Sequence, residues 1–206
     1  MGQAMKMKLY HSTRSPFVRK VVVAAMESGQ IDDIEITPGD PHNTDPDLLA
    51  ANAISKIPAL VTAEGVALPE SDLICLYLDE RSGGRLIPPK GAARWRTFRV
   101  QALADGFMEA AVVRRSETLR PDAVRWRAEI DRLMDRMMRC LDALESETAA
   151  VATSPGLGAI ATAAALGYAG FRYPDFDWRR GRPGLAAFFE EFDARPSMEA
   201  TRHIDT

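Results

Sequence analysis

Hydrophobic and polar positions along the first 85 residues follow the pattern of short strands alternating with helices. Short apolar runs predict strands at 7–12 and 31–38, and two more within 57–71 that are joined at Glu64-Gly65. Apolar residues at three- and four-residue steps predict helices at 15–28, 45–53 and 71–83, with Ser71 as the cap of the last. The predicted order β-α-β-α-β-β-α indicates an α/β domain over residues 1–85.

After a linker at residues 85–92 that contains two prolines and a glycine, the pattern becomes helical. Helices are predicted at 92–119, from Pro121 onward, at 158–171 and at 183–194. The inner faces of the first two are expected to carry Trp95, Phe98, Leu103, Phe107, Ala110 and Ala111, and Trp126, Ile130, Leu133, Met137, Leu141 and Leu144. Residues 92–206 are therefore expected to form an all-helical domain.

Composition and charge exclude several classes of function. The chain has 206 residues, of which 46% are hydrophobic and 27% charged, as in ordinary globular proteins. A net charge of −3 argues against a nucleic-acid or anionic membrane partner, because phosphate binding needs clustered Lys and Arg. No apolar run approaches the roughly 18 residues of a membrane span, and no signal-peptide pattern is present, so we expect a cytoplasmic protein.

The cysteines and histidines predict neither a disulfide nor a metal site. Cys75 and Cys140 lie inside apolar segments without C-x-x-C spacing, and the three histidines are scattered. Cys75 lies on a helix whose Leu73, Leu76 and Leu78 are predicted to be buried, which favours a structural thiol over a redox thiol.

Ser15 stands directly before Pro16 at the predicted start of the first helix. A serine there caps the helix, or it shares the positive helix end and its free N–H groups with a bound anion such as a thiolate. Ser12 and Thr13 are rival hydroxyl groups in the same loop. The residues by themselves leave these roles open.

Four motifs occur in the order and spacing of a known family: MKLYHSTRSPFVRKV, SKIPAL, PESDLICLYLDE and FRYPDFDWRRGRPGLAAFFEEFDARPSM. On these motifs the chain resembles the soluble glutathione transferases over almost its whole length. The resemblance implies a thioredoxin-like N-terminal domain, a helical C-terminal domain and a homodimer. It also implies glutathione as co-substrate and no other cofactor.

The resemblance gives roles to residues of the N-terminal domain. Ser15 replaces the cysteine of glutaredoxin-like relatives and would stabilise the glutathione thiolate, with Ser12 beside it. Pro58 is expected to follow a cis bond, which leaves the Ile57 backbone to pair with the cysteinyl residue of glutathione. Lys56 would meet the glycyl carboxylate as a point charge.

The γ-glutamyl end of glutathione is expected to bind where the 71–83 helix starts. Ser71 and the helix N-terminus would hold its carboxylate, and Glu70 would accept from its ammonium. Asp72 and, in a homodimer, Asp105 of the partner subunit are further acids for that ammonium. An ordinary helix start would carry Glu70 and Ser71 as well, so the pair by itself is not decisive.

The second substrate is expected between the loop after the first strand and the first long C-terminal helix. Its candidate residues are Thr13, Arg14, Met108, Val112 and Arg115. They fit a hydrophobic electrophile with or without a negative charge, although helix packing explains the apolar ones equally well. The implied activity is conjugation of glutathione to that electrophile, a detoxification reaction. The alternatives are an interaction protein of the same fold with little catalysis, and a glutathione-dependent thiol-disulfide reductase.

One departure from the family pattern concerns the 158–171 helix. The family places a capping box where this chain has Gly156 and Ala159. Either another group caps this helix, or its start is shifted.

Overall fold

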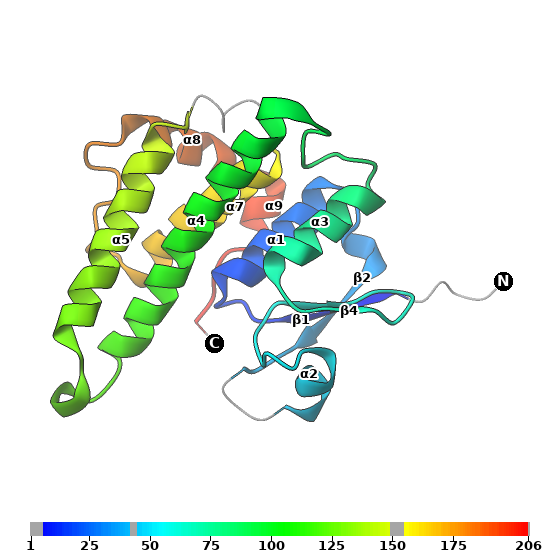
Figure 1. The fold of residues 1–206 in the computed structure, drawn as a ribbon, viewed down its shortest axis with the longest axis horizontal. Coiled ribbons are helices and arrows are strands. Elements are labelled where there is room, and N and C mark those ends of the chain that lie inside the picture. The colour runs from blue at the N-terminus through cyan, green and yellow to red at the C-terminus, as the bar shows by residue number, and fades with distance from the viewer. Residues whose placement is uncertain (1–5, 42–44, 149–154, 206) are drawn as a thin grey trace. The chain divides into compact units, whose positions relative to one another are not determined.

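The computed structural model describes residues 6–41, 45–148 and 155–205, which form two compact units (Figure 1). The first unit contains the chain up to Ile87 together with the segment from Ser197 onward, and the second contains Pro88–Pro196. The end of the chain thus differs from the expected domain over 92–206. The reason is hydrogen bonding to the first unit, which begins with Ser197 Oγ donating to Glu27.

The first unit is built on a mixed sheet whose strand order, within the described residues, is β2-β1-β3-β4. The strands are β1 (Met7–His11), β2 (Ile34–Pro38), β3 (Ala59–Val61) and β4 (Ala67–Leu68). β1 is parallel to β2 and antiparallel to β3, and β3 is antiparallel to β4. Met7, Leu9 and Tyr10 of the central strand are buried, which places β1 in the core.

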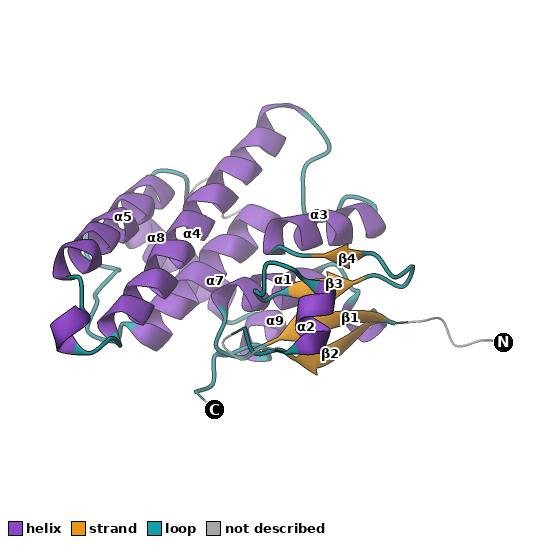
Figure 2. Ribbon diagram, turned by 60° about the horizontal axis from the view of Figure 1, so that its bottom comes forward, coloured by secondary structure: helices purple, strands orange, loops and turns teal. Residues whose placement is uncertain are grey.

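Helices cover both faces of this sheet. α1 (Pro16–Glu27) and α3 (Ser71–Arg81) lie on one face, and α2 (Pro46–Ala51) lies on the other (Figure 2). The element order is the predicted one, and the result is a thioredoxin-like domain. The predicted strand over 31–38 begins only at Ile34, because Asp33 N–H donates to the carbonyl of Gln30 and residues 31–33 form a 3-10 turn.

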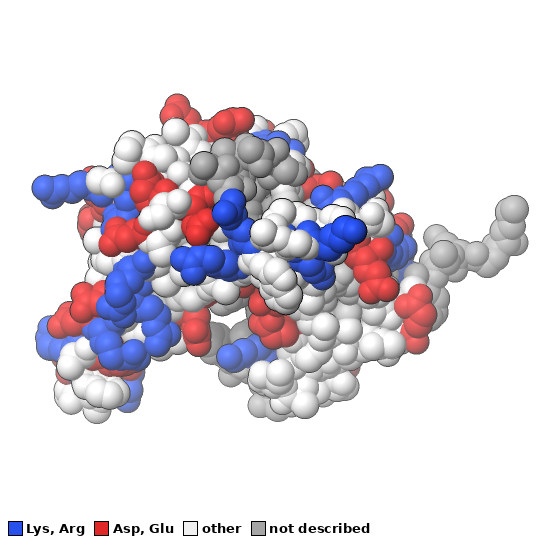
Figure 3. Space-filling model, turned by 45° about the horizontal axis from the view of Figure 1, so that its top comes forward, with Lys and Arg blue, Asp and Glu red and all other residues white. Residues whose placement is uncertain are grey.

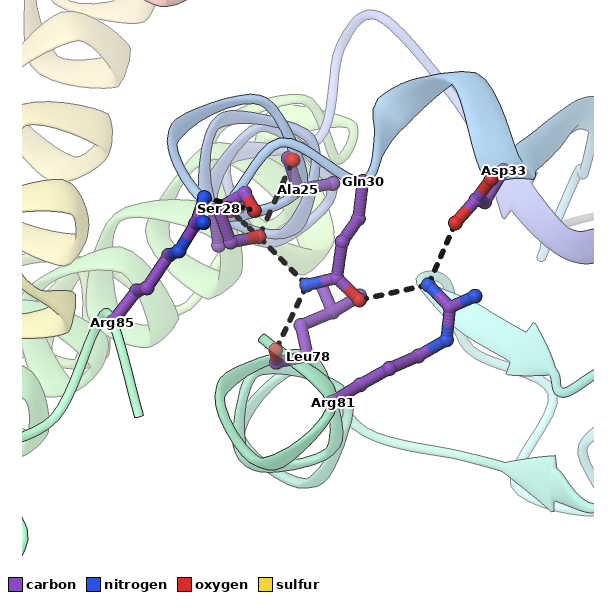
Figure 4. A network of polar contacts seen from close by, with 8 residues as sticks. Ala25, Ser28, Gln30, Asp33, Leu78, Arg81 and Arg85 are labelled. Carbon is purple, nitrogen blue, oxygen red and sulfur yellow. Dashed lines mark hydrogen bonds and ion pairs between the residues drawn. The ribbon is translucent and has the colours of Figure 1, made fainter. Parts of the chain in front are cut away.

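Gln30 ties the C-terminal ends of α1 and α3 together (Figure 4). Its side-chain nitrogen donates to Ser28 Oγ and to the carbonyl of Leu78, both at 2.8 Å. Its Oε1 accepts from Arg81 at 3.0 Å, and Arg81 also pairs with Asp33 at 2.8 Å. Because Gln30 is buried, these bonds offset the loss of its contacts with water.

The second unit is helical. Its longer helices are α4 (Gly91–Thr118), α5 (Arg127–Glu145), α7 (Leu157–Arg172) and α8 (Pro183–Asp193). α7 is the central helix, with most of its residues buried. Gly158 permits its close contact with α4, since a Cβ atom at that position would lie 3.2 Å from Val100 Cγ1.

Glycine 156 is the N-cap of α7, so this helix starts where the family pattern places its start. Within the described residues, no side chain hydrogen-bonds to the cap. Neither of the two expected compensations, a substitute cap or a shifted start, is found there. The first turn of α7 therefore relies on burial of residues such as Leu157 and Ile160.

Two tryptophans that were predicted to face the helical core are exposed. Trp95 is 71% exposed near the start of α4, and Trp126 is 63% exposed at the N-cap of α5. Pro121 precedes a 3-10 turn (Asp122–Val124), and α5 begins only at Arg127. Apolar spacing identifies a face but does not show whether a neighbour covers it near a helix start. Further along α5 the predicted face is confirmed by the buried Leu133, Met137, Leu141 and Leu144.

The C-terminal end of α5 supports the start of α8. Glu145 accepts from the backbone N–H groups of Gly184 at 2.9 Å and Leu185 at 2.7 Å. Arg182, which is buried, donates through Nε and Nη2 to Asp142 at 2.9 and 2.6 Å. A carboxylate at a helix N-terminus satisfies N–H groups that have no partner within the helix.

Charged side chains of both signs are interspersed over the face drawn in Figure 3. On α5, for example, Arg132 pairs with Glu129 one turn away at 2.5 Å. Such exposed pairs neutralise each other and contribute little to stability. In the described part of the chain, no helix is long and apolar enough to cross a membrane.

Candidate functional site

Three segments of the first unit meet at one end of the sheet. β1 ends at His11, and its antiparallel register places Tyr10 beside Ala59, so the segment before β3 adjoins the loop after β1. Leu60 lies beside Leu68, so the chain leaving β4 toward α3 emerges at the same end. The topology thus brings together the predicted site residues at 12–15, 56–58 and 70–71.

Ser15 is the N-cap of α1. Its Oγ accepts from the N–H of Val18 at 3.3 Å, and Pro16 occupies the first helical position. The cap uses a lone pair of the hydroxyl oxygen. The hydroxyl proton stays available for donation, because the described residues provide no acceptor for it. Capping and anion binding are therefore compatible, because a hydroxyl accepts and donates at the same time.

The neighbouring hydroxyl groups differ in their hydrogen bonds. Thr13 Oγ1 donates to the carbonyl of Ile204 at 3.1 Å, so its proton is already used. Ser12 Oγ accepts from the N–H of Arg14 at 3.3 Å and keeps its proton. The geometry favours Ser12 and Ser15 over Thr13 as donors to a ligand.

The Ile57-Pro58 bond is cis, as the resemblance implies. Asn52, which is buried at the end of α2, shapes the loop before it. Its Nδ2 donates to the carbonyl of Lys56 at 2.8 Å, and its Oδ1 accepts from the N–H of Ile54 at 2.9 Å. Asn52 is not among the residues predicted from sequence, although an asparagine between a helix and a strand is typical of such a turn.

Gly39 is a second residue near the site that belongs to none of the motifs identified in the sequence. Its N–H donates to the carbonyl of His11 at 3.0 Å. A Cβ atom on Gly39 would lie 3.1 Å from Ile57 Cγ2 and 3.2 Å from Tyr10 Cβ. Both contacts are closer than side chains normally accept, so glycine allows the end of β2 to approach Ile57.

Glu70 and Ser71 begin α3, but the cap is Glu70 and not Ser71 as predicted. Glu70 Oε2 accepts from the N–H of Asp72 at 3.0 Å, which makes Ser71 the first helical residue. Ser71 is buried, and its Oγ has no hydrogen-bond partner among the described residues. An unpaired buried hydroxyl costs free energy, and this one lies at a helix N-terminus, where anions bind favourably.

Lys20 places a buried positive charge near the start of α3. Its side chain is fully buried on α1, and its Nζ pairs with Asp72, whose side chain is 48% exposed. The pair connects the helix that follows Ser15 to the helix that begins with Ser71. Asp72 is therefore already engaged by Lys20, which competes with its expected contact to the ammonium of glutathione.

The candidates for the second substrate are divided between the two units. Thr13 and Arg14 belong to the first unit, and the other three lie on α4. Met108 is fully buried among the helices, the packing role that the sequence left open. Val112 and Arg115 are half-buried, as is Asp105.

Cys75 is fully buried on α3, in agreement with a structural thiol. Leu78 is also buried, but Leu73 is 44% and Leu76 is 37% exposed, so the prediction of burial was wrong for these two. A helix that turns Cys75 and Leu78 inward necessarily turns positions 73 and 76 outward. Burial raises the pKa of the Cys140 thiol, which keeps it protonated at neutral pH.

Family models match both parts of the chain. A model of the glutathione S-transferase N-terminal domain matches residues 9–86, and a model of the glutathione S-transferase C-terminal domain matches residues 127–191. The chain belongs to the glutathione S-transferase family.

Relatives in this glutathione S-transferase family match nearly the full length of the chain. It is 33% identical to the uncharacterized GST-like protein YibF of Escherichia coli K12, over 95% of this chain and 98% of YibF. It is 41% identical to a family member from Pseudomonas fluorescens Pf-5, with a TM-score of 0.92 over 97% of this chain and 100% of that one. For a glutathione S-transferase from Methylobacillus flagellatus KT, the identity is 32% and the TM-score 0.89, with coverage of 97% and 100%.

Both of these solved glutathione S-transferases contain bound glutathione. In the part of the present chain that the structure describes, no group of His, Cys, Asp and Glu side chains is arranged to hold a metal ion.

Proposed function

We propose that this family member binds glutathione at the end of the sheet and transfers its thiolate to a hydrophobic electrophile. The supporting observation is the buried Ser71 hydroxyl, which lacks a partner among the described residues and lies at the N-terminus of α3. A ligand carboxylate there accepts from Ser71 and from helix N–H groups. The glutathione in the two solved relatives supports this choice of ligand.

The remaining groups of glutathione find complementary chemistry at the same end of the sheet. Glu70 is exposed and accepts from the γ-glutamyl ammonium while its Oε2 caps α3. The backbone of Ile57 pairs with the cysteinyl backbone as an added strand would. Lys56, which is exposed, meets the glycyl carboxylate.

Ser15 stabilises the thiolate by donating a hydrogen bond from its hydroxyl to the sulfur, and the proton stays on the serine oxygen. The thiol proton leaves to solvent, the sulfur lone pair forms a bond to the electrophilic carbon, and the electrons of the broken bond depart with the leaving group or move into the acceptor. Lowering a thiol pKa near 8.5 by about two units requires roughly 2.7 kcal/mol. One charge-assisted hydrogen bond at a helix N-terminus is able to supply that amount.

The ultraviolet absorbance of the thiolate of bound glutathione, measured against pH, tests this proposal. Ser15→Ala should raise the apparent pKa by about one to two units while changing the dissociation constant at low pH only slightly. Ser12→Ala is the matched comparison: a pKa shift in this variant alone would assign the thiolate contact to Ser12. Lack of thiolate and lack of conjugation to chlorodinitrobenzene in the unmodified protein would reject transferase activity.

The role of Ser71 has its own test. Ser71→Ala should weaken glutathione binding about ten- to hundredfold in calorimetry, since a charged hydrogen bond contributes about 1.5–3 kcal/mol. Ser82→Ala at the other end of α3 is the control, because Ser82 Oγ donates locally, to the carbonyl of Asp79. Equal affinities for the two variants would contradict the placement of the γ-glutamyl carboxylate.

The proposed active form is a two-fold homodimer that joins the N-terminal domain of one chain to α4 of the other. Leu73 and Leu76 are exposed on α3 and offer an apolar surface for a partner to cover. In that arrangement Asp105 of the partner subunit approaches the γ-glutamyl ammonium. Light scattering at micromolar concentration should give the mass of a dimer, and Leu73→Glu should give a monomer.

One observation and one assay separate this proposal from its alternatives. Burial of Cys75 argues against a thiol-disulfide reductase, because attack on a disulfide requires an accessible thiolate. A binding protein with little catalysis would be retained on glutathione-agarose but would fail to conjugate chlorodinitrobenzene.

A further inference from the structure

Residues 197–205, here called the C-terminal strap, run along α1 within the first unit. At the C-terminal end of α1, Ser197 Oγ donates to Glu27. In the first turn of α1, the buried Arg19 donates to the carbonyl of Met198 at 3.0 Å and to Thr201 Oγ1 at 3.3 Å. The strap therefore runs antiparallel to α1 and heads for the loop that precedes this helix.

The strap ends on Thr13, which it holds by two hydrogen bonds of opposite direction. Thr13 Oγ1 donates to the carbonyl of Ile204 at 3.1 Å, and His203 Nδ1 lies 2.8 Å from the carbonyl oxygen of Thr13. Because a carbonyl oxygen only accepts, Nδ1 carries the proton and donates. One donor and one acceptor on the same residue fix its orientation more strongly than either bond does by itself.

Within the described residues, the other hydrogen bonds of loop residues 12–15 are local. Arg14 N–H donates to Ser12 Oγ at 3.3 Å, and Ser15 N–H donates to the carbonyl of Ser12 at 3.2 Å. Bonds between residues two or three positions apart shape a turn but do not attach it to the rest of the fold. That attachment comes from His203 and Ile204, about 190 positions further along the chain.

We propose that the strap positions the Ser15 hydroxyl for the thiolate, with His203 as a positioning residue that acts through Thr13. This inference rests on the proposed function, because it takes Ser15 as the donor to the sulfur. Thr13 lies two positions before Ser15. Loss of the hydrogen bonds between Thr13 and the strap therefore lets the loop move, and the Ser15 hydroxyl at the start of α1 no longer points toward the sulfur. The strap thereby contributes to thiolate formation without touching glutathione.

The test compares His203→Leu with His203→Asn, whose amide keeps a donor near the position of Nδ1. His203→Leu should raise the apparent pKa of bound glutathione by about half a unit to one unit. It should also speed hydrogen exchange of the Ser15 amide about tenfold or more. His203→Asn should recover most of both effects, and Glu199→Ala, at an exposed residue of α9 (Pro196–Glu199), should show neither.

A second pair of variants keeps the test valid where His203→Leu does not fold. Thr13→Val removes the hydroxyl that donates to Ile204, whereas Thr13→Ser retains it, so only the former should reproduce the shift in thiolate pKa.

The outcomes separate this inference from the proposed function. Absence of a bound thiolate in the unmodified protein would reject the function, and the exchange of Ser15 would still report on the attachment of the loop. A normal thiolate in the unmodified protein, with no pKa shift in His203→Leu and Thr13→Val, would overturn the positioning role and leave the function standing. Faster exchange with an unchanged thiolate pKa would likewise overturn it, since the strap would then be a structural contact only.

Discussion

The buried ammonium of Lys20 on α1 is paired with the carboxylate of Asp72 in the first turn of α3. The two residues are 52 positions apart, and they join the two helices whose N-termini carry the proposed site. A fully buried ammonium requires a compensating charge, whereas the half-exposed carboxylate retains contact with water. The pair is therefore asymmetric, and its two halves respond differently to mutation.

Asp72→Asn should destabilise the protein more than Lys20→Met, because it removes the Asp72 carboxylate while the charge of the buried ammonium stays in place. We expect a loss of about 1–3 kcal/mol, below the 3–5 kcal/mol of a fully buried pair because Asp72 is half-exposed. Urea unfolding measures both variants. Asp33→Asn, which breaks the exposed pair with Arg81, should cost less than about 1 kcal/mol. A larger loss of unfolding free energy for Lys20→Met than for Asp72→Asn would contradict the asymmetry.

Gly39→Ala should lower both stability and glutathione affinity. The added methyl group meets Ile57 and Tyr10 at 3.1–3.2 Å, and such overpacking costs about 1–3 kcal/mol. The displaced Ile57 backbone should then bind the cysteinyl residue less well, which calorimetry with glutathione detects. Gly170→Ala in α7 is the control, since open space surrounds that position and alanine favours a helix by roughly 0.5–1 kcal/mol. Equal effects of the two substitutions would refute this account.

Glu145→Ala should destabilise the helical unit by about 0.5–2 kcal/mol, the usual range for loss of a helix N-cap. The substitution removes the acceptor of the Gly184 and Leu185 N–H groups. Glu190→Ala at an exposed position of α8 provides the matched control and should change thermal stability little. No difference between the two melting temperatures would show that solvent satisfies the start of α8 equally well.

Part of the stability of the fold should be lost on acidification because His11 is partly buried in its neutral form. Burial lowers the pKa of His11 below its ordinary value of 6.5. As the pH falls below 6.5, the unfolded chain takes up the proton first, so stability declines until the pH passes the folded-state pKa. Unfolding free energies measured from about pH 7.5 to pH 5 should show a smaller decline for His11→Gln, which does not titrate. Identical pH profiles would contradict this assignment.

Local patterns predicted the order of elements and much of the helical core. The stripe through Leu133, Met137 and Leu141 is buried, and the turn at Glu64-Gly65 does separate β3 from β4. These features depend on residues close in sequence, whose spacing fixes which side chains share a face. Ser15 is the clearest case, because Pro16 after it already marks a helix start.

The same patterns failed where a face had to be assigned to the inside or the outside. Leu73, Leu76, Trp95 and Trp126 are apolar and correctly spaced, yet they are exposed in the single chain. Periodicity measures the direction of a side chain relative to its helix, and only packed neighbours determine whether that direction leads into a core. Ser71 was misassigned as a cap for a related reason, since Glu70 competes for the same N–H groups.

For this protein, the sequence by itself determined the strands and helices, the serine before the first helix and the family motifs, because each is written within a few neighbouring residues. The tertiary structure decided which hydroxyls near that serine keep a free proton, which charge Lys20 faces and where the end of the chain lies. Thr13 meets Ile204, and Lys20 meets Asp72, only after the sheet and its helices have assembled. Such long-range contacts depend on the packing of whole elements, and no local spacing of residues encodes them.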